Sequence, residues 1–95
     1  MTKAHGNVAR WGTSQDATYT TTAASPAAAV GQGVTRLRIM VTTDARIRVG
    51  KSPTATTTDT YLPALVPEYV IVSPGENVSA VQVSASGILN VTEAD

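Results

Sequence analysis

The stretch TRLRIMVTTDARIRVGK, residues 35–51, indicates the fold class, because apolar and polar side chains alternate along it in two successive runs. The apolar members of the runs are Leu37, Ile39, Val41, Ala45, Ile47 and Val49. Alternation with a period of two is typical of β-strands that bury one face. We therefore expect two half-buried strands joined by a short turn.

The turn length can be predicted from parity. A two-residue loop at positions 43–44 would set Val41 against Arg46, which mixes an apolar and a charged side chain on one face. A three-residue loop, 42–44, sets Val41 against Ala45 and keeps the faces pure, so we predict that register. It also places Arg38 opposite Arg48, and directly opposed like charges destabilise a strand pair. These arginines therefore need an anionic counterpart.

Charge is unevenly distributed along a chain whose formal net charge is zero. Residues 36–51 carry five basic residues and one acid, whereas residues 52–95 carry five acids and no basic residue. One interpretation is that the acids pair with the arginines inside the chain; another is that the two patches meet across a subunit contact or face a partner protein. Nucleic acid is not expected as a partner, because the net charge is zero and aromatic residues are few.

The rest of the chain also favours strands. Strand-like composition occurs at 17–24 and 68–73, Pro74 and Gly75 fit a type II turn, and a Thr- and Pro-rich link spans 52–67. At the C-terminus we predict a hairpin with a loop at 85–87 that pairs Val83 with Leu89 and puts Gly87 in the left-handed region. We expect a small all-β sandwich, jelly-roll-like, with about six to eight short antiparallel strands, or an open barrel as the alternative. Residues 1–16 are predicted to form a flexible, extended N-terminal arm and 17–95 a single domain.

Composition argues against catalysis and metal binding. The chain has no cysteine, and its one histidine, His5, lies in the predicted arm. No nucleophile–histidine arrangement, phosphate-binding loop or calcium loop occurs. We therefore expect no enzyme activity, no cofactor and no metal, and no stretch is apolar enough to predict a membrane helix.

Binding to protein surfaces is the remaining class of function. In a chain without phenylalanine, Tyr69 is expected to fill the core, Tyr61 is ambiguous, and Trp11 is expected to contact a neighbour. The candidate partner-binding residues are Arg10, Trp11, Arg36, Arg38, Arg46, Arg48 and Tyr61.

The last fifty or so residues resemble a pattern found in small structural proteins of tailed bacteriophages. The matching segments are TDARIRVG (43–50), PTATTTDTYLPALVPEY (53–69) and PGENVSAVQVSASGILNVTE (74–93). The resemblance implies a capsid decoration (cement) protein that binds the major capsid protein on the outer shell and stabilises the head. It would be made in the host cytoplasm and reside on the virion surface.

Two other functions stay open on the sequence. The protein could be another virion component of the neck, tail or fibre, or a carbohydrate-binding β-sandwich module. The thin, ring-poor core favours a homo-oligomer, a dimer or trimer, because association supplements a small core.

Overall fold

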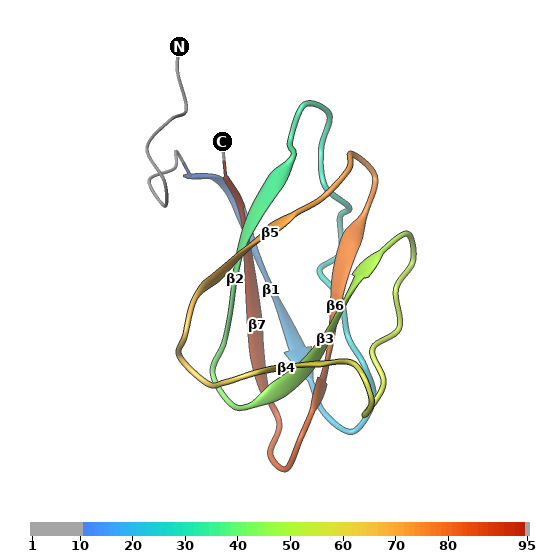
Figure 1. Ribbon diagram of the computed structural model, residues 1–95, viewed down its shortest axis with the longest axis vertical. Helices are drawn as coiled ribbons and strands as arrows, with labels where there is room; N and C mark the ends of the chain where they lie inside the picture. Colours follow the sequence, from blue (N-terminus) through green and yellow to red (C-terminus); the bar gives the residue numbers. More distant parts are fainter. Residues whose placement is uncertain (1–10, 95) are drawn as a thin grey trace.

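Residues 11–94, the part of the chain that the structure describes, form seven strands in two antiparallel sheets packed face to face (Figure 1). In this computed structural model the strands are β1 (Trp11–Tyr19), β2 (Arg36–Val41), β3 (Ala45–Gly50), β4 (Thr60–Leu62), β5 (Glu68–Ile71), β6 (Asn77–Gln82) and β7 (Gly87–Ala94). Sheet A has the order β1-β7-β2-β5, and sheet B has the order β4-β3-β6. The predicted all-β class is confirmed.

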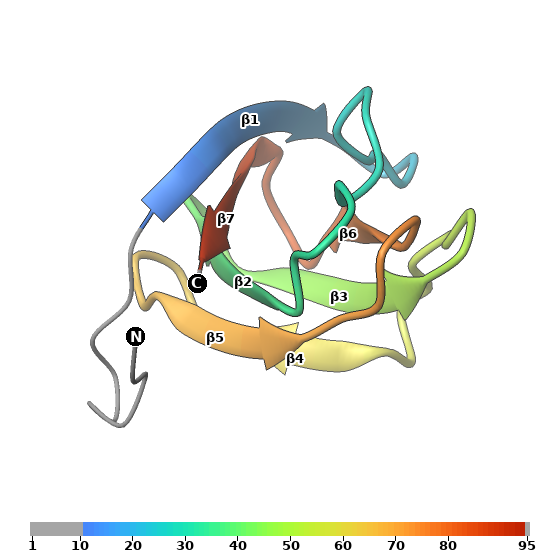
Figure 2. The same ribbon diagram turned by 90° about the horizontal axis from the view of Figure 1, so that it is seen from above.

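The two sheets face each other (Figure 2), and the core between them consists of the apolar residues that alternate in the sequence. Leu37, Ile39 and Val41 of β2 face Ala45 and Ile47 of β3 across the interior, and all five are buried. Further core residues are Tyr19, Leu62, Val78, Ala80, Leu89 and Val91. The Arg-bearing faces of β2 and β3 therefore point outward, away from each other, on opposite sides of the sandwich.

The two predicted hairpins are wrong. β2 pairs with β5 and β7, and β3 pairs with β4 and β6, so the chain crosses from sheet A to sheet B between Val41 and Ala45. The segment between β6 and β7 crosses back in the same way. Parity could not detect this, because a crossing between two facing sheets keeps the apolar sides together as well as a hairpin does. Arg38 consequently does not oppose Arg48; it lies opposite Tyr69 and Thr92.

Tyr19 packs against Gly87 at the point where the chain crosses between the two sheets, and it links the two crossings. The ring of Tyr19 is fully buried, and its hydroxyl donates to the carbonyl of Thr43 at 2.6 Å and accepts the Thr43 N–H at 3.2 Å. Gly87 lies opposite Tyr19, and a Cβ at Gly87 would come within 2.6 Å of the Tyr19 hydroxyl. Gly87 is therefore needed for close approach, and the left-handed backbone predicted for it is wrong, since Gly33 and Gly75 are the glycines with positive φ in the described residues. The type II turn at Pro74–Gly75 is confirmed by the Gly75 φ of 88° and the Glu76 N–H bond to the Ser73 carbonyl.

The N-terminal strand is longer than predicted. β1 begins at Trp11, so residues 11–16, which were assigned to the arm, are part of sheet A and pair with β7. Residues 1–10, including Arg10, lie outside the described residues.

Candidate interaction surface

The outer face of sheet A brings together side chains from three strands that are distant in sequence. Alternation turns Arg36 and Arg38 of β2 outward, and the register places Ile71 and Tyr69 of β5 beside them. Trp11 joins this group from the first position of β1. We name these five residues, Trp11, Arg36, Arg38, Tyr69 and Ile71, the sheet A cluster.

Arginine and aromatic side chains stack within the sheet A cluster. The guanidinium carbon of Arg38 lies 5.5 Å from the centre of the Trp11 ring, and that of Arg36 lies 5.7 Å from the centre of the Tyr69 ring. The Trp11 indole N–H donates to the Tyr69 hydroxyl at 3.3 Å, so the two rings meet across Arg38. Each stacked pair contributes about 0.5–1 kcal/mol at an exposed site. These contacts hold the side chains in place within the single chain, and side chains that are already ordered lose less entropy on binding.

Much of the sheet A cluster is open to solvent. Trp11 is 67% exposed and Ile71 is 86% exposed, while both arginines and Tyr69 are half-buried. The expectation that Tyr69 belongs to the core is wrong, because the ring on the inner face is Tyr19. Trp, Tyr and Arg are the residues most enriched at binding hot spots, and here they lie together on one face.

The other predicted binding residues lie on the outer face of sheet B, where Arg46 stacks on Tyr61 and both arginines bond to Asp59. Arg48 forms a bidentate ion pair with Asp59, with both nitrogen–oxygen distances at 3.0 Å. Arg46 stacks over the Tyr61 ring at 4.9 Å and donates to the Asp59 carbonyl at 3.3 Å. The Tyr61 hydroxyl donates in turn to the carboxylate of Asp44.

Each carboxylate in this second group has ordinary hydrogen-bond donors that stabilise its charge. The Arg48 guanidinium, followed by the Thr56 N–H, lowers the pKa of Asp59. The Tyr61 hydroxyl, followed by the Ala64 N–H, lowers the pKa of Asp44. The hydrogen bond to Asp44 raises the pKa of Tyr61. Both carboxylates are therefore already hydrogen-bonded to neighbouring groups of the same chain.

The part of the outer face of sheet B that β6 forms is covered by another segment. Ser79 and Val81 of β6 face the same side as Arg48 and Arg46, yet they are only 1% and 5% exposed. The link before β4 lies over them, and the Ala55 N–H donates to the Ser79 hydroxyl at 2.9 Å. The interpretation that acids of the second half pair with arginines inside the chain is therefore confirmed for Arg48. We assign this group to stabilising the fold.

The structure thus divides the predicted residues between two faces. Trp11, Arg36 and Arg38 gather on sheet A, and Arg46, Arg48 and Tyr61 gather on sheet B. Tyr69 and Ile71 were missed as surface residues. Four apolar residues in a row, YVIV at 69–72, favoured a strand with both faces partly covered, whereas the structure leaves the outer face of β5 open, with Ile71 86% exposed.

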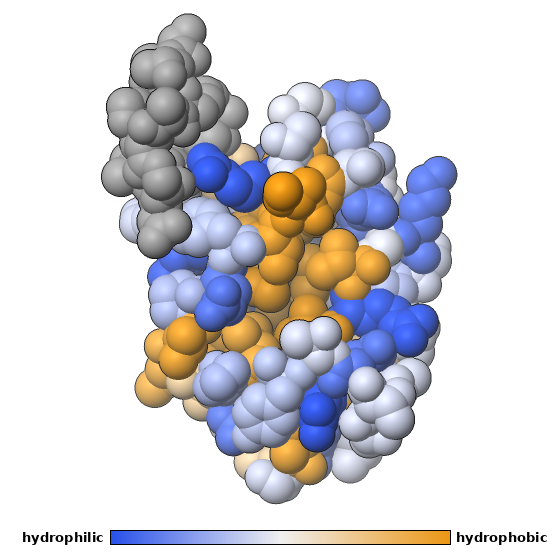
Figure 3. Space-filling view, in the orientation of Figure 1, coloured by the Kyte–Doolittle hydropathy of each residue, from blue (hydrophilic) through white to orange (hydrophobic). Residues whose placement is uncertain are grey.

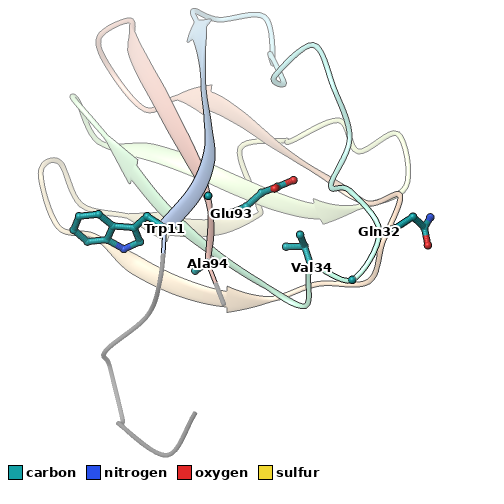
Figure 4. A pocket seen from close by; sticks show the side chains of 7 residues that line it. Trp11, Gln32, Val34, Glu93 and Ala94 are labelled. Atoms are coloured by element: carbon teal, nitrogen blue, oxygen red, sulfur yellow. The ribbon is translucent and has the colours of Figure 1, made fainter. Parts of the chain in front are cut away.

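A shallow hollow beside Trp11 does not form a ligand site. It is lined by Trp11, Gln32, Val34 and Glu93, among others, with a volume of about 340 Å³. Figure 4 shows the indole and the Glu93 side chain pointing away from each other, on opposite sides of the strands that carry them. The Glu93 carboxylate instead accepts the Gly31 N–H at 3.1 Å. Aromatic and carboxylate groups that diverge cannot hold one sugar or amine between them.

The described residues contain no group of three His, Cys, Asp or Glu side chains close enough to hold a metal ion. Within residues 11–94 there is also no helix of the length and apolar character that crossing a membrane requires. No protein-family model, curated protein or solved structure matches this chain.

Proposed function

We propose that this protein is a capsid decoration protein of a tailed bacteriophage, which binds the major capsid protein on the outer shell through the sheet A cluster. The observation that carries the proposal is the exposed, pre-ordered stack of Trp11, Arg38 and Tyr69, with Ile71 beside it. Such a surface suits a role that needs only complementary contacts with neighbouring subunits. The phage assignment itself rests on the sequence resemblance of residues 43–93.

We further propose that the sandwich is a jelly roll with one strand reduced. In an eight-stranded jelly roll, one sheet holds strands one, eight, three and six, and the other holds two, seven, four and five. Removing strand two and renumbering gives the orders β1-β7-β2-β5 and β4-β3-β6 seen here. The isolated bridge between Ala24 and Ala80 lies where strand two would pair with β6. Jelly rolls are common in viral capsid proteins, which supports a virion role.

The test is binding to phage heads. Fluorescently tagged protein would be added to purified heads of the phage that encodes it, and bound copies would be counted and located by microscopy. We expect many copies over the shell and a higher melting temperature of the heads. A few copies at one vertex or along the tail would instead support a neck, tail or fibre component, and no binding would refute both.

Point variants test the surface. Trp11→Ala should weaken head binding by about 30-fold or more, the usual effect of truncating a hot-spot residue. Leu65→Ser is a matched control, since Leu65 is also 67% exposed but lies outside the sheet A cluster. If the two variants bind equally well, the sheet A cluster is not the binding surface.

A further inference from the structure

An apolar groove runs between the two sheets on the side where β4 and β5 form their edges. Its volume is about 410 Å³. The lining residues are Ile39, Ile47, Val49, Thr60, Tyr61, Leu62, Pro63, Glu68 and Val70. Figure 3 shows apolar surface in the middle of this face, between the positions of β5 and β4 in Figure 1. The sandwich is therefore open here, and part of its core is reachable by another segment.

The edge of β5 offers backbone hydrogen-bonding groups beside this groove. The Val72 N–H bonds to the Thr35 carbonyl, so Val70, two residues earlier, also turns its backbone groups toward β2. The N–H and C=O groups of Tyr69 and Ile71 alternate with these and point away from β2. β5 is the end strand of sheet A, and no described residue pairs along its outer side. An extended segment could add to the sheet at this edge.

The sequence before Trp11 has the pattern of such a segment. In KAHGNV, residues 3–8, Ala4, Gly6 and Val8 fall on one side of an extended chain and the polar residues on the other. This is the alternation of a half-buried strand, with small side chains toward the apolar floor of the groove.

Reach favours a second copy over the same chain. Trp11 belongs to β1, which is three strand spacings, about 14 Å, from β5 across sheet A, and the groove lies beyond β5. Three Cα–Cα steps separate Trp11 from Val8, and they span about 10 Å at most. Val8 of one chain therefore does not reach alongside its own β5, so residues 3–8 can all lie along β5 only when a neighbouring molecule presents them.

We propose that residues 3–8 of one copy add a strand to sheet A of a second copy, along β5, with Ala4, Gly6 and Val8 in the groove. This goes beyond the proposed function, since it concerns self-association and uses none of the sheet A cluster side chains. It gives the segment before Trp11 a role that its composition alone could not assign.

Sedimentation equilibrium of the full-length chain tests the proposal. Val8→Asp places a charge toward the apolar groove, and we expect its self-association constant to fall by about 100-fold relative to the wild type. Asn7→Asp is the matched control, because it adds the same charge on the polar side of the segment. A wild-type chain that stays monomeric at about 100 μM, or variants that associate equally, would overturn the proposal.

Cross-linking identifies the contact directly, since the chain has no cysteine of its own. Full-length Val8→Cys and full-length Thr60→Cys would be mixed under oxidising conditions, Thr60 being exposed at the rim of the groove. We expect a disulfide-linked heterodimer, formed more slowly when Asn7→Cys replaces Val8→Cys. If instead only the double variant Val8→Cys/Thr60→Cys cross-links, within one chain, the second-copy assignment is wrong.

Head binding separates this proposal from the proposed function. Val8→Asp leaves Trp11 and Arg38 in place, so single copies should still bind phage heads. If Val8→Asp abolishes head binding but leaves self-association unchanged, the segment contacts the shell and does not fill the groove of a second copy.

Discussion

Adding one methyl group at Gly87 should destabilise the whole domain. Gly87 lies beneath the Tyr19 ring, and a Cβ there would meet the hydroxyl oxygens of Tyr19 at 2.6 Å and Thr42 at 2.8 Å, as well as that of Thr43. Distances below 3.0 Å require these groups to move. Gly87→Ala therefore disturbs the point where the crossings between the two sheets meet.

The magnitude follows from what must move. Overpacking a tight site costs about 1–3 kcal/mol. The displaced hydroxyls also hold hydrogen bonds, from Tyr19 to the Thr43 carbonyl at 2.6 Å and from the Ile88 N–H to Thr42 at 2.9 Å, each contributing about 1 kcal/mol. We expect the free energy of unfolding to fall by about 3 kcal/mol. That is a large share of the roughly 5–14 kcal/mol typical of a domain of this size.

Gly50→Ala provides the control within the same fold. Gly50 ends β3 with ordinary backbone geometry, and no atom lies within 4 Å of a Cβ built there. This variant should be neutral or stabilising by up to about 1 kcal/mol, because alanine restricts the unfolded chain. Urea denaturation followed by Trp11 fluorescence and by circular dichroism measures both variants. If Gly87→Ala is within 1 kcal/mol of Gly50→Ala, the close packing of Tyr19 over Gly87 does not govern stability as we argue.

Three further predictions concern charge and strain. Arg48 lowers the pKa of Asp59, so this carboxylate contributes stability above pH about 4 that is lost as pH falls through its folded-state pKa. Asp59→Asn should therefore lose less unfolding free energy between pH 7 and pH 3 than the wild type. Parallel curves of unfolding free energy against pH for the two proteins would contradict this. Leu65 has a φ of 63° with an exposed side chain, so Leu65→Gly should relieve about 1–2 kcal/mol of strain, offset in part by glycine's entropy, for a net gain of about 0.5–1 kcal/mol in urea denaturation; a loss would show that the Leu65 side chain stabilises the fold. Arg38→Gln should weaken head binding and reduce its salt dependence, with little effect on the free energy of unfolding. Arg48→Gln should lower the free energy of unfolding and leave head binding and its salt dependence unchanged. Equal effects of the two variants would contradict the different roles assigned to the two faces.

The extent of β2 and β3 was predictable because it depends on local alternation. RLRIMV and ARIRVG form strands at the predicted positions, and five of the six predicted apolar residues are buried, whereas Val49 is half-buried in the groove lining. The pairing of these strands was not predictable, because it depends on contacts with β5, β6 and β7, whose positions the alternation does not contain. Alternation with a period of two indicates which side of a strand is apolar, but it does not indicate which sheet covers that side.

The beginning of β1 was hidden for a different reason. WGTSQD, residues 11–16, has too few apolar side chains to read as a strand, yet it pairs with β7 through the backbone. Its outward side chains are held by polar contacts, since the Asn90 amide donates to Ser14 and to Asp16, both at 2.9 Å. This part of β1 is a strand because it pairs with β7, and its own composition does not predict a strand.

Three of the five residues of the sheet A cluster could be predicted from the sequence. Trp11, Arg36 and Arg38 could be chosen as exposed, interface-prone residue types without knowing the fold. Tyr69 and Ile71 could not be chosen, because their exposure depends on β5 being an edge strand with an uncovered outer side.

The same R-x-R pattern on two strands has two outcomes, and the neighbours decide between them. Beside β3, the link before β4 brings Asp59, and an ion pair neutralises the charge of Arg48 within the chain. Beside β2, Arg38 meets the Trp11 ring, which orders the guanidinium but leaves its positive charge in place. Sheet A therefore presents positive charge and apolar rings on one exposed face. A partner complementary to the positive charge and to the rings would combine carboxylates with an apolar patch. A partner carboxylate placed next to the Trp11 ring could bond Arg38 bidentately.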